Sequence, residues 1–172
     1  MSPLRFHTVL FDWGDTVMRD DPAATIPMAE WEQVHAVEGI TPVLAYLQSS
    51  GRRCILATSA NVSTESQIRL ALGRVGLDRY FEHIFSASNT GLRKGEEFYR
   101  RILTDMKLEA AAAAMVGDSL QYDVLIPNRL GIYAVWFNPR SAERRAAELH
   151  TTVQTMQEFL SFWRSLDGHA GD

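Results

Sequence analysis

The sequence predicts an α/β fold of the doubly wound type, in which a Rossmann-like parallel sheet carries helices on both faces. Short apolar runs of strand length alternate along the chain with segments of helical periodicity, as is typical of parallel strands joined by crossover helices. Several of the runs are apolar throughout, which is expected of strands buried on both faces. The 172 residues, 46% of them hydrophobic, suit a single domain that we assign to residues 1–172.

The predicted elements follow one another in regular order. Strands are expected at Thr8–Asp12, Arg53–Thr58, His83–Ala87, Ala114–Asp118 and Tyr133–Phe137. Helices are expected at Pro42–Ser50, Ser63–Val75, Glu96–Met106, Tyr122–Leu130 and Ser141–Leu149. Three of these helices are followed by a glycine, Gly51, Gly76 or Gly131, as is common where a helix ends. A last amphipathic helix is predicted over Thr155–Leu166, with an apolar face made of Met156, Phe159, Leu160 and Trp163.

Composition and charge argue against several classes of protein. The net charge is −4 and no segment concentrates Lys and Arg, which argues against nucleic acid as a main partner. No apolar run is long enough to span a membrane, and the first residues lack the apolar core of a signal peptide. The single cysteine, Cys54, cannot form an internal disulfide, so a reducing, cytoplasmic setting is predicted. The oligomeric state stays open, a homo-oligomer included.

Polar side chains follow four of the predicted strands. Ligands of a doubly wound sheet bind beyond the carboxyl ends of its strands, and we expect the first strand to be central. The residues at these ends are Asp12 after the first strand, Thr58 and Ser59 after the second, Lys94 after the third, and Asp118, Ser119 and Asp123 after the fourth. Each alone has an ordinary interpretation as a turn residue, a helix cap or a surface lysine. Their joint occurrence at one edge favours a site.

These residue types suit the transfer of a phosphoryl group. A carboxylate such as Asp12 can attack phosphorus and hold an aspartyl-phosphate. The two reactants repel each other, so a cation is required, and Mg²⁺ prefers oxygen ligands of the kind that Asp12, Asp118 and Asp123 offer. Lys94 would add fixed positive charge. A hydroxyl of Thr58 or Ser59, with nearby backbone N–H groups, would bind a phosphate oxygen.

The order of these residues resembles the four motifs of the haloacid dehalogenase (HAD) superfamily of hydrolases over nearly the whole chain. The similar stretches are "VLFDWGDTV", "CILATSAN", "GLRKGEEFY" and "MVGDSLQYDV", although Gly95 stands where the family often has proline. The resemblance implies a HAD-like fold, Mg²⁺ and most often hydrolysis of a phosphate ester, on a small phosphorylated substrate or a phosphorylated macromolecule. It implies these roles: nucleophile for Asp12, phosphate ligand for Thr58, catalytic lysine for Lys94, and acids near the metal for Asp118 and Asp123.

The first motif departs from the family pattern Asp-x-Asp-Gly-Thr, because Gly14 stands where the second Asp is usual and Asp15 follows it. In the family that Asp protonates the leaving oxygen and later activates water. Gly14 can still offer its backbone carbonyl to Mg²⁺. A shift of one residue along extended backbone turns a side chain to the opposite face. Asp15 therefore either acts as the acid from a new position or only shapes the turn, and both alternatives stay open.

The family's mobile cap has little room in this chain. Residues 17–39, after the first motif, are long enough only for a flap and one short helix around Met28–Val37, so we predict a member with no cap or a minimal one. Without a lid, water must be excluded by the substrate, a neighbouring subunit or the flap. Arg19, Asp20 and Asp21 in this flap either touch substrate or form a solvated turn.

Two functions of different classes fit these observations. The first is a Mg²⁺-dependent phosphohydrolase that acts on a phosphate monoester through an aspartyl-phosphate. The second is a HAD-fold binding protein with low turnover, which the missing general acid favours. A response-regulator-type phosphoacceptor fits less well, since its phosphorylated Asp follows the third strand. A dehalogenase also fits less well. It does not need two metal-directed acids after the fourth strand, and the cap that would enclose a halo-acid is missing from this chain.

Overall fold

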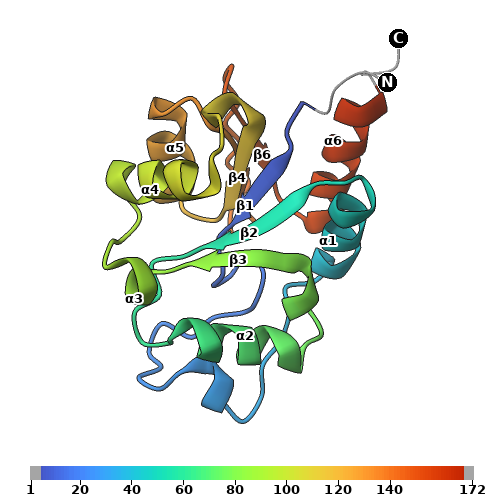
Figure 1. Ribbon diagram of the computed structural model, residues 1–172. Helices are drawn as coiled ribbons and strands as arrows, with labels where there is room; N and C mark the ends of the chain where they lie inside the picture. Colours follow the sequence, from blue (N-terminus) through green and yellow to red (C-terminus); the bar gives the residue numbers. More distant parts are fainter. Residues whose placement is uncertain (1–4, 169–172) are drawn as a thin grey trace.

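The computed structural model describes residues 5–168, in which six parallel strands form one sheet between two layers of helices (Figure 1). The strands are β1 (Thr8–Phe11), β2 (Arg53–Ala57), β3 (Phe81–Phe85), β4 (Ala113–Gly117), β5 (Tyr133–Phe137) and β6 (His150–Val153). They are arranged in the order β3-β2-β1-β4-β5-β6. β1 lies inside the sheet between β2 and β4, which confirms its predicted central position and makes its carboxyl end the point where the strand order reverses.

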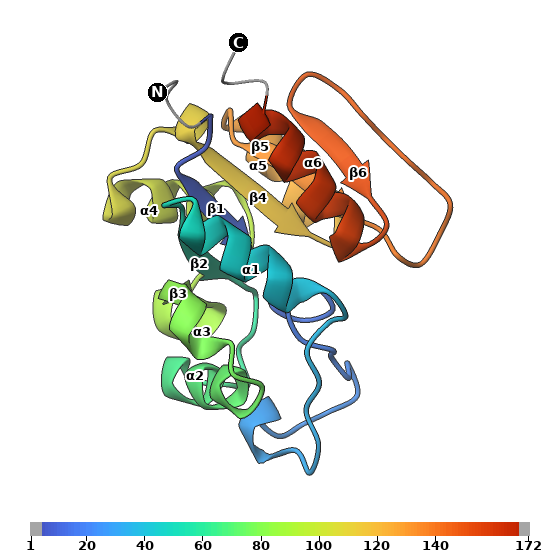
Figure 2. The same cartoon turned by 90° about the vertical axis from the view of Figure 1, so that its right-hand side faces the viewer.

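The helices cover both faces of the sheet, as predicted for the doubly wound class. They are α1 (Ile40–Ser49), α2 (Glu65–Arg74), α3 (Ala87–Thr90), α4 (Glu96–Met106), α5 (Ile126–Arg129) and α6 (Met156–Gly168). Figure 2 shows α1 and α6 on one face, with α4 and α5 behind the sheet. Side chains of β1 alternate accordingly, since Val9 and Phe11 pack in the cluster of α1 and α6 whereas Leu10 packs in that of α4.

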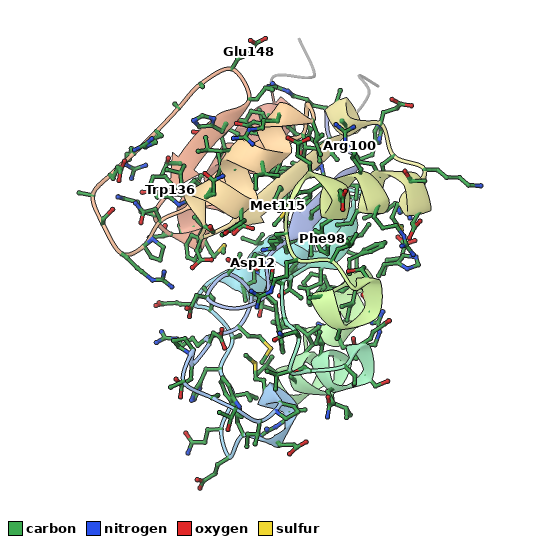
Figure 3. All side chains as sticks on the ribbon, turned by 90° about the vertical axis from the view of Figure 1, so that its left-hand side faces the viewer. Asp12, Phe98, Arg100, Met115, Trp136 and Glu148 are labelled. Atoms are coloured by element: carbon green, nitrogen blue, oxygen red, sulfur yellow. The ribbon has the colours of Figure 1, made fainter. Side chains whose placement is uncertain are left out.

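Asp12 marks the end of the sheet at which the polar residues gather. In Figure 3 it lies at the lower edge of the sheet, with Phe98 and Met115 in the apolar core above it. Phe98 from α4 and Met115 from β4 belong to one buried cluster and are fully enclosed. The carboxylate therefore stands on a rigid, close-packed base, which suits a site that must hold its geometry.

Most predicted elements are confirmed, with ends displaced by at most two residues. Tyr133–Phe137 and Glu96–Met106 have the predicted bounds, and Gly51, Gly76 and Gly131 have positive φ angles of 80°, 73° and 83° after their helices. The apolar face predicted for the last helix is buried in α6. No helix within residues 5–168 is long and apolar enough to cross a membrane.

The predicted helix Ser141–Leu149 is wrong. Residues 141–148 form an exposed irregular loop, which leads into β6. This segment has no apolar stripe to bury, and a short helix without tertiary packing is marginal. Side chains hold the loop instead, because the Arg145 N–H donates to Thr152 Oγ1 at 2.8 Å and Asn138 Nδ2 donates to the carbonyl of Glu143 at 3.0 Å.

Two other predicted helices and one predicted strand differ from the structure. In place of Tyr122–Leu130 there are a π-helical segment, Leu120–Leu125, and the single turn α5. Around Met28–Val37 only a 3₁₀ turn forms, at Met28–Glu30. β3 begins and ends two residues before the predicted His83–Ala87. It ends at Phe85 because Ser86 caps the short helix α3.

Candidate active site

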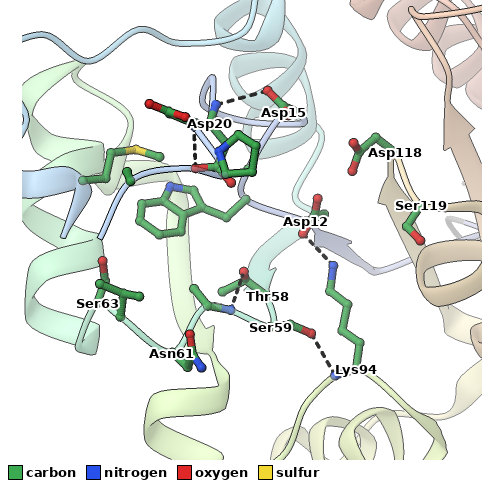
Figure 4. A pocket seen from close by; sticks show the side chains of 18 of the residues that line it. Asp12, Asp15, Asp20, Thr58, Ser59, Asn61, Ser63, Lys94, Asp118 and Ser119 are labelled. Carbon is green, nitrogen blue, oxygen red and sulfur yellow. Dashed lines mark hydrogen bonds and ion pairs between the residues drawn. The ribbon is translucent and has the colours of Figure 1, made fainter. Parts of the chain in front are cut away.

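Three carboxylates from the segments that follow β1 and β4 meet at the carboxyl edge of the sheet. Asp12, Asp118 and Asp123 each offer a carboxylate oxygen, and these oxygens lie within 4.8 Å of one another. The register of β1 and β4 brings them together, because Phe11 pairs with Val116 and the Asp12 N–H donates to the Val116 carbonyl at 2.9 Å. The predicted juxtaposition of Asp12 and Asp118 is confirmed (Figure 4).

Lys94 lies between two of these acids. Its Nζ is 2.6 Å from Asp12 Oδ1 and 2.6 Å from Asp123 Oδ1, and the lysine is almost fully buried. Burial opposes the charge, but the two carboxylates outweigh it and raise the pKa of Lys94 above its ordinary value. Ser59 fixes the loop, since its Oγ accepts a hydrogen bond from the Lys94 backbone N–H at 3.0 Å. Lys94 is therefore held as a permanent cation beside Asp12.

The second oxygen of Asp12 also has a partner. Thr16 Oγ1 donates to Asp12 Oδ2 at 3.2 Å, and Thr16 is fully buried. The sequence analysis did not single out this threonine, although it lies four residues after Asp12. A hydroxyl and an ammonium thus orient the carboxylate from opposite oxygens.

Asp123 is positioned by the π-helical segment Leu120–Leu125. The extra residue of a π-turn redirects side chains, and such turns are frequent at functional sites. Asp123 Oδ2 accepts a hydrogen bond from the Ser119 N–H at 3.0 Å, and the Tyr99 hydroxyl donates to the Tyr122 carbonyl at 2.7 Å. Burial raises the pKa of Asp123, although Lys94 opposes the shift.

Asp118 borders the cavity, and its pKa is raised by burial and by the carboxylates beside it. Burial, together with the negative charge of Asp12, raises the pKa of Asp118 to about 7. Arg140 opposes this shift and lies 3.1 Å from Asp118 Oδ2. Three crowded carboxylates form an excess of hard oxygen donors, which is the donor set that fits Mg²⁺.

Thr58 and Ser59 border the same cavity, which has a volume of about 640 Å³ and is also lined by the three acids, Lys94 and Gly14. Thr58 follows β2, and its Oγ1 accepts a hydrogen bond from the Ala60 N–H at 3.1 Å. Within residues 5–168 this hydroxyl donates to no protein acceptor, so its hydrogen is available to a ligand. The second predicted motif is therefore placed beside the first.

Asp15 lies near Asp12 but is bound on both of its oxygens. Its backbone is left-handed, with φ 58°. Asp15 Oδ1 accepts the Asp20 N–H at 3.1 Å, and Oδ2 lies 2.8 Å from the guanidinium of Arg140. Arg140, from the loop after β5, was missed by the sequence analysis. Its position after the carboxyl end of β5 is the signal in the sequence that indicates it.

The flap folds back over this region. The Arg19 N–H donates to the His35 carbonyl and the Val37 N–H donates to the Val17 carbonyl, each at 2.9 Å, so the two ends of the flap run side by side. Asp20 and Asp21 line the cavity, whereas Arg19 borders a neighbouring one.

Asp20 lies above Asp12 in Figure 4, next to Asp15. Partial desolvation raises the pKa of Asp20, with smaller contributions from the charges of Asp15 and Asp12, while the Asp21 N–H lowers it.

The comparisons with known proteins agree with this geometry. A family model described as haloacid dehalogenase-like hydrolase matches residues 13–131. The glyceraldehyde 3-phosphate phosphatase of Pyrococcus abyssi is 29% identical over 102 residues, which are 59% of this chain and 42% of that protein. The ribulose-1,5-bisphosphate 5-phosphatase of Halopiger xanaduensis is 30% identical over 125 residues, which are 68% of this chain and 51% of that protein. The chain thus spans about half the length of these relatives.

Solved structures share the fold over almost the whole chain. A protein from Listeria monocytogenes serotype 4b has a TM-score of 0.81 at 19% sequence identity, covering 95% of this chain and 99% of that one. At this identity the likeness concerns the fold alone. It agrees with the single sheet and two helix layers described above.

Proposed function

Since the chain belongs to the family of haloacid dehalogenase-like hydrolases, we propose that it is a Mg²⁺-dependent phosphohydrolase that cleaves a phosphate monoester through an aspartyl-phosphate on Asp12. The observation that carries this proposal is the convergence of Asp12, Asp118 and Asp123 within 4.8 Å, with the ammonium of Lys94 between Asp12 and Asp123. A carboxylate nucleophile, hard metal ligands and a fixed cation are the parts that phosphoryl transfer requires.

The proposed reaction has two steps. In the first, a carboxylate oxygen of Asp12 attacks phosphorus, the bond from phosphorus to the leaving oxygen breaks, and the leaving oxygen takes up a proton. In the second, water attacks the phosphorus of the aspartyl-phosphate, the bond to Asp12 breaks, and inorganic phosphate leaves. Lys94, whose Nζ lies 2.6 Å from Asp12 Oδ1, would offset the negative charges of the Asp12 carboxylate and of the phosphoryl oxygens that meet there.

The proposed metal ligands are the carboxylates of Asp12 and Asp118 and the carbonyl of Gly14, with Asp123 bound directly or through water. When bound, Mg²⁺ supplies positive charge that offsets the repulsion between the phosphate and Asp12. The raised pKa of Asp118 supports this assignment, because a site that repels its own carboxylate charges favours a divalent cation.

The substrate phosphate is proposed to bind at the carboxyl end of β2. Thr58 would donate its hydroxyl to a phosphate oxygen, and Ser59 would hold the Lys94 loop or contact the phosphate. We propose a small phosphorylated compound as substrate. The named relatives support this, since one is called a glyceraldehyde 3-phosphate phosphatase and another a ribulose-1,5-bisphosphate 5-phosphatase.

Further features of the proposal concern the whole chain. We assign residues 1–172 to one domain and residues 17–39 to a flap in the place of a cap. We propose a cytoplasmic setting because the single Cys54 has no second cysteine with which to form an internal disulfide. The oligomeric state stays open.

A second candidate function is a binding protein of low turnover. The specific observation in its favour is that Asp15, the acid nearest in sequence to the usual position, is bound by Arg140 and by the Asp20 N–H. As general acid, Asp15 would have to leave both partners. Its catalytic role therefore stays a prediction.

Release of inorganic phosphate tests the proposal. A panel of phosphorylated metabolites should include substrates that are hydrolysed with Mg²⁺ and not with EDTA. Asp12→Asn should abolish that turnover while leaving the circular dichroism spectrum unchanged, because the nucleophile is lost and the shape is kept. Full activity of Asp12→Asn, or no Mg²⁺-dependent hydrolysis of any panel member, would contradict the proposal.

A further inference from the structure

Asp20 of the flap occupies the space beside Gly14 that a side chain at position 14 would fill. We infer that Asp20 is the general acid and base of this enzyme and replaces, in space, the acid that the first motif lacks. The inference rests on the proposed phosphohydrolase function and deepens it, because it assigns the proton transfers of the same site.

The close approach of Asp20 to Gly14 carries this inference. A Cβ atom built on Gly14 would lie 2.8 Å from Asp20 Oδ2, 3.1 Å from its Cγ and 3.1 Å from its Cβ. Real Cβ atoms do not approach other atoms as closely as 2.8 Å. A side chain at position 14 would therefore require Asp20 to shift, and glycine at this place leaves room for the flap carboxyl group where it stands.

The two oxygens of Asp20 differ in their surroundings. Oδ1 accepts the Asp21 N–H at 2.9 Å. Within residues 5–168 the structure shows no hydrogen bond to Oδ2, the oxygen next to Gly14, and Asp20 lines the cavity that holds Asp12 and Lys94. One oxygen thus fixes the carboxyl group while the other is left for proton exchange with a ligand in the cavity.

Asp15 acquires a positioning role in this arrangement. Its backbone is left-handed, with φ 58°, and its Oδ1 accepts the Asp20 N–H at 3.1 Å. Its Oδ2 is held by Arg140 at 2.8 Å. Asp15 therefore anchors the flap that carries Asp20, and the exchanged order of Gly14 and Asp15 has one explanation: position 14 makes room and position 15 holds the replacement in place.

The proton balance closes with Asp20 alone. In the first step the Asp20 carboxylic acid gives its proton to the leaving oxygen as the bond to phosphorus breaks, and Asp20 becomes a carboxylate. In the second step this carboxylate takes a proton from the attacking water while the bond between phosphorus and Asp12 breaks. Asp12 is then a free carboxylate and Asp20 is protonated again, as at the start.

Leaving-group dependence tests the inference. A poor leaving group needs protonation, whereas 4-nitrophenolate leaves without it. Asp20→Asn should therefore lower kcat on an alkyl phosphate about 10²–10⁴-fold and change kcat on 4-nitrophenyl phosphate only a few-fold. The matched control is Glu30→Gln, which removes one negative charge from an exposed flap position outside the cavity and should change neither rate.

A relocated carboxyl group provides the second test. The double variant Gly14→Asp with Asp20→Gly returns an acid to the usual family position. Its kcat on an alkyl phosphate should be at least tenfold higher than that of the single variant Asp20→Gly. Mg²⁺ affinity, measured by calorimetry, should be the same in Asp20→Asn as in the wild type, which reports that the remaining site is intact.

The outcomes separate this inference from the proposed function. Two results would overturn the role of Asp20 and leave Asp12 as nucleophile. The first is an equal loss of kcat on both substrates in Asp20→Asn. The second is a loss selective for alkyl phosphates in Asp15→Asn but not in Asp20→Asn. If the Asp12→Asn variant kept the phosphate-ester hydrolysis of the wild type, the proposed function itself would be overturned.

Discussion

The carboxylate of Asp123 lies directly against the backbone of Gly117, so close that not even a methyl group fits between them. A Cβ atom built on Gly117 would overlap the carboxyl carbon and Oδ2 of Asp123. Gly117 is the last residue of β4, and Asp123 returns to it from the π-helical segment. The glycine thus permits the third acid to reach Asp12.

Gly117→Ala should accordingly displace Asp123. We expect a loss of at least tenfold in Mg²⁺ affinity and in turnover, because the added methyl group pushes the carboxylate away from Asp12. The control is Gly73→Ala in α2, where a Cβ meets no atom of the described part of the chain within 4 Å and where alanine is the better helix former by roughly 1 kcal/mol. Unchanged Mg²⁺ affinity in Gly117→Ala would show that Asp123 takes no part in the metal site.

The two lysines should differ sharply in importance. Lys94 is buried between Asp12 and Asp123, whereas Lys107 ends α4 with a left-handed backbone of φ 53°. Lys94→Ala should lower turnover at least 10²-fold, since two buried carboxylates lose their cation. Lys107→Ala should change turnover less than twofold. Equal effects in a phosphate-release assay would mean that the third motif is placed wrongly.

Asp118 should contribute to metal affinity. Asp118→Asn removes one negative charge from the cluster of three acids and should weaken Mg²⁺ binding at least tenfold in calorimetry. Asp105→Asn, on the exposed side of α4 where it pairs with Arg101, is the matched control and should leave the affinity unchanged. An unaltered affinity in Asp118→Asn would remove Asp118 from the set of ligands.

The raised pKa of Asp118 also predicts how the stability of the metal-free protein depends on pH. The pKa of Asp118 is about 7 in the folded chain against 3.8 as its ordinary value, so the folded state binds this proton more tightly than the unfolded state does. The free energy of unfolding of the metal-free protein should therefore rise as pH falls from 8 towards 5. Carboxylates with lowered pKa, such as Asp167, lose their contribution only at lower pH and act outside this window.

Thermal unfolding in EDTA checks this dependence. The midpoint temperature of the wild type should increase between pH 8 and pH 5.5, and Asp118→Asn should show a smaller increase. Mg²⁺ should raise the midpoint more at pH 8 than at pH 5.5, since binding requires deprotonated ligands. A variant with the same pH dependence as the wild type would place the titrating group elsewhere.

Much of the fold and site followed from local patterns. The strands β1, β2, β4 and β5 are short apolar runs buried on both faces, and their periodicity is a property of a few consecutive residues. The convergence of Asp12, Asp118 and Lys94 was predictable because parallel strands place their carboxyl ends at one edge. The order of the four motifs predicted the haloacid dehalogenase-like family, and the family model that matches residues 13–131 confirms this prediction.

Relations through space could not be predicted in this way. Helix propensity in residues 141–149 was overridden because the segment has no face to bury and is held by contacts with β6, such as the hydrogen bond between Arg145 and Thr152. The approach of Asp20 to Gly14 and the pairing of Arg140 with Asp15 depend on where two loops fold back. The sequence alone determined which chemical groups stand at the end of each strand, since this depends on neighbours in the chain. Only the tertiary structure decided which loop carboxylate fills the space beside Gly14, since this depends on close packing between segments that no local pattern describes.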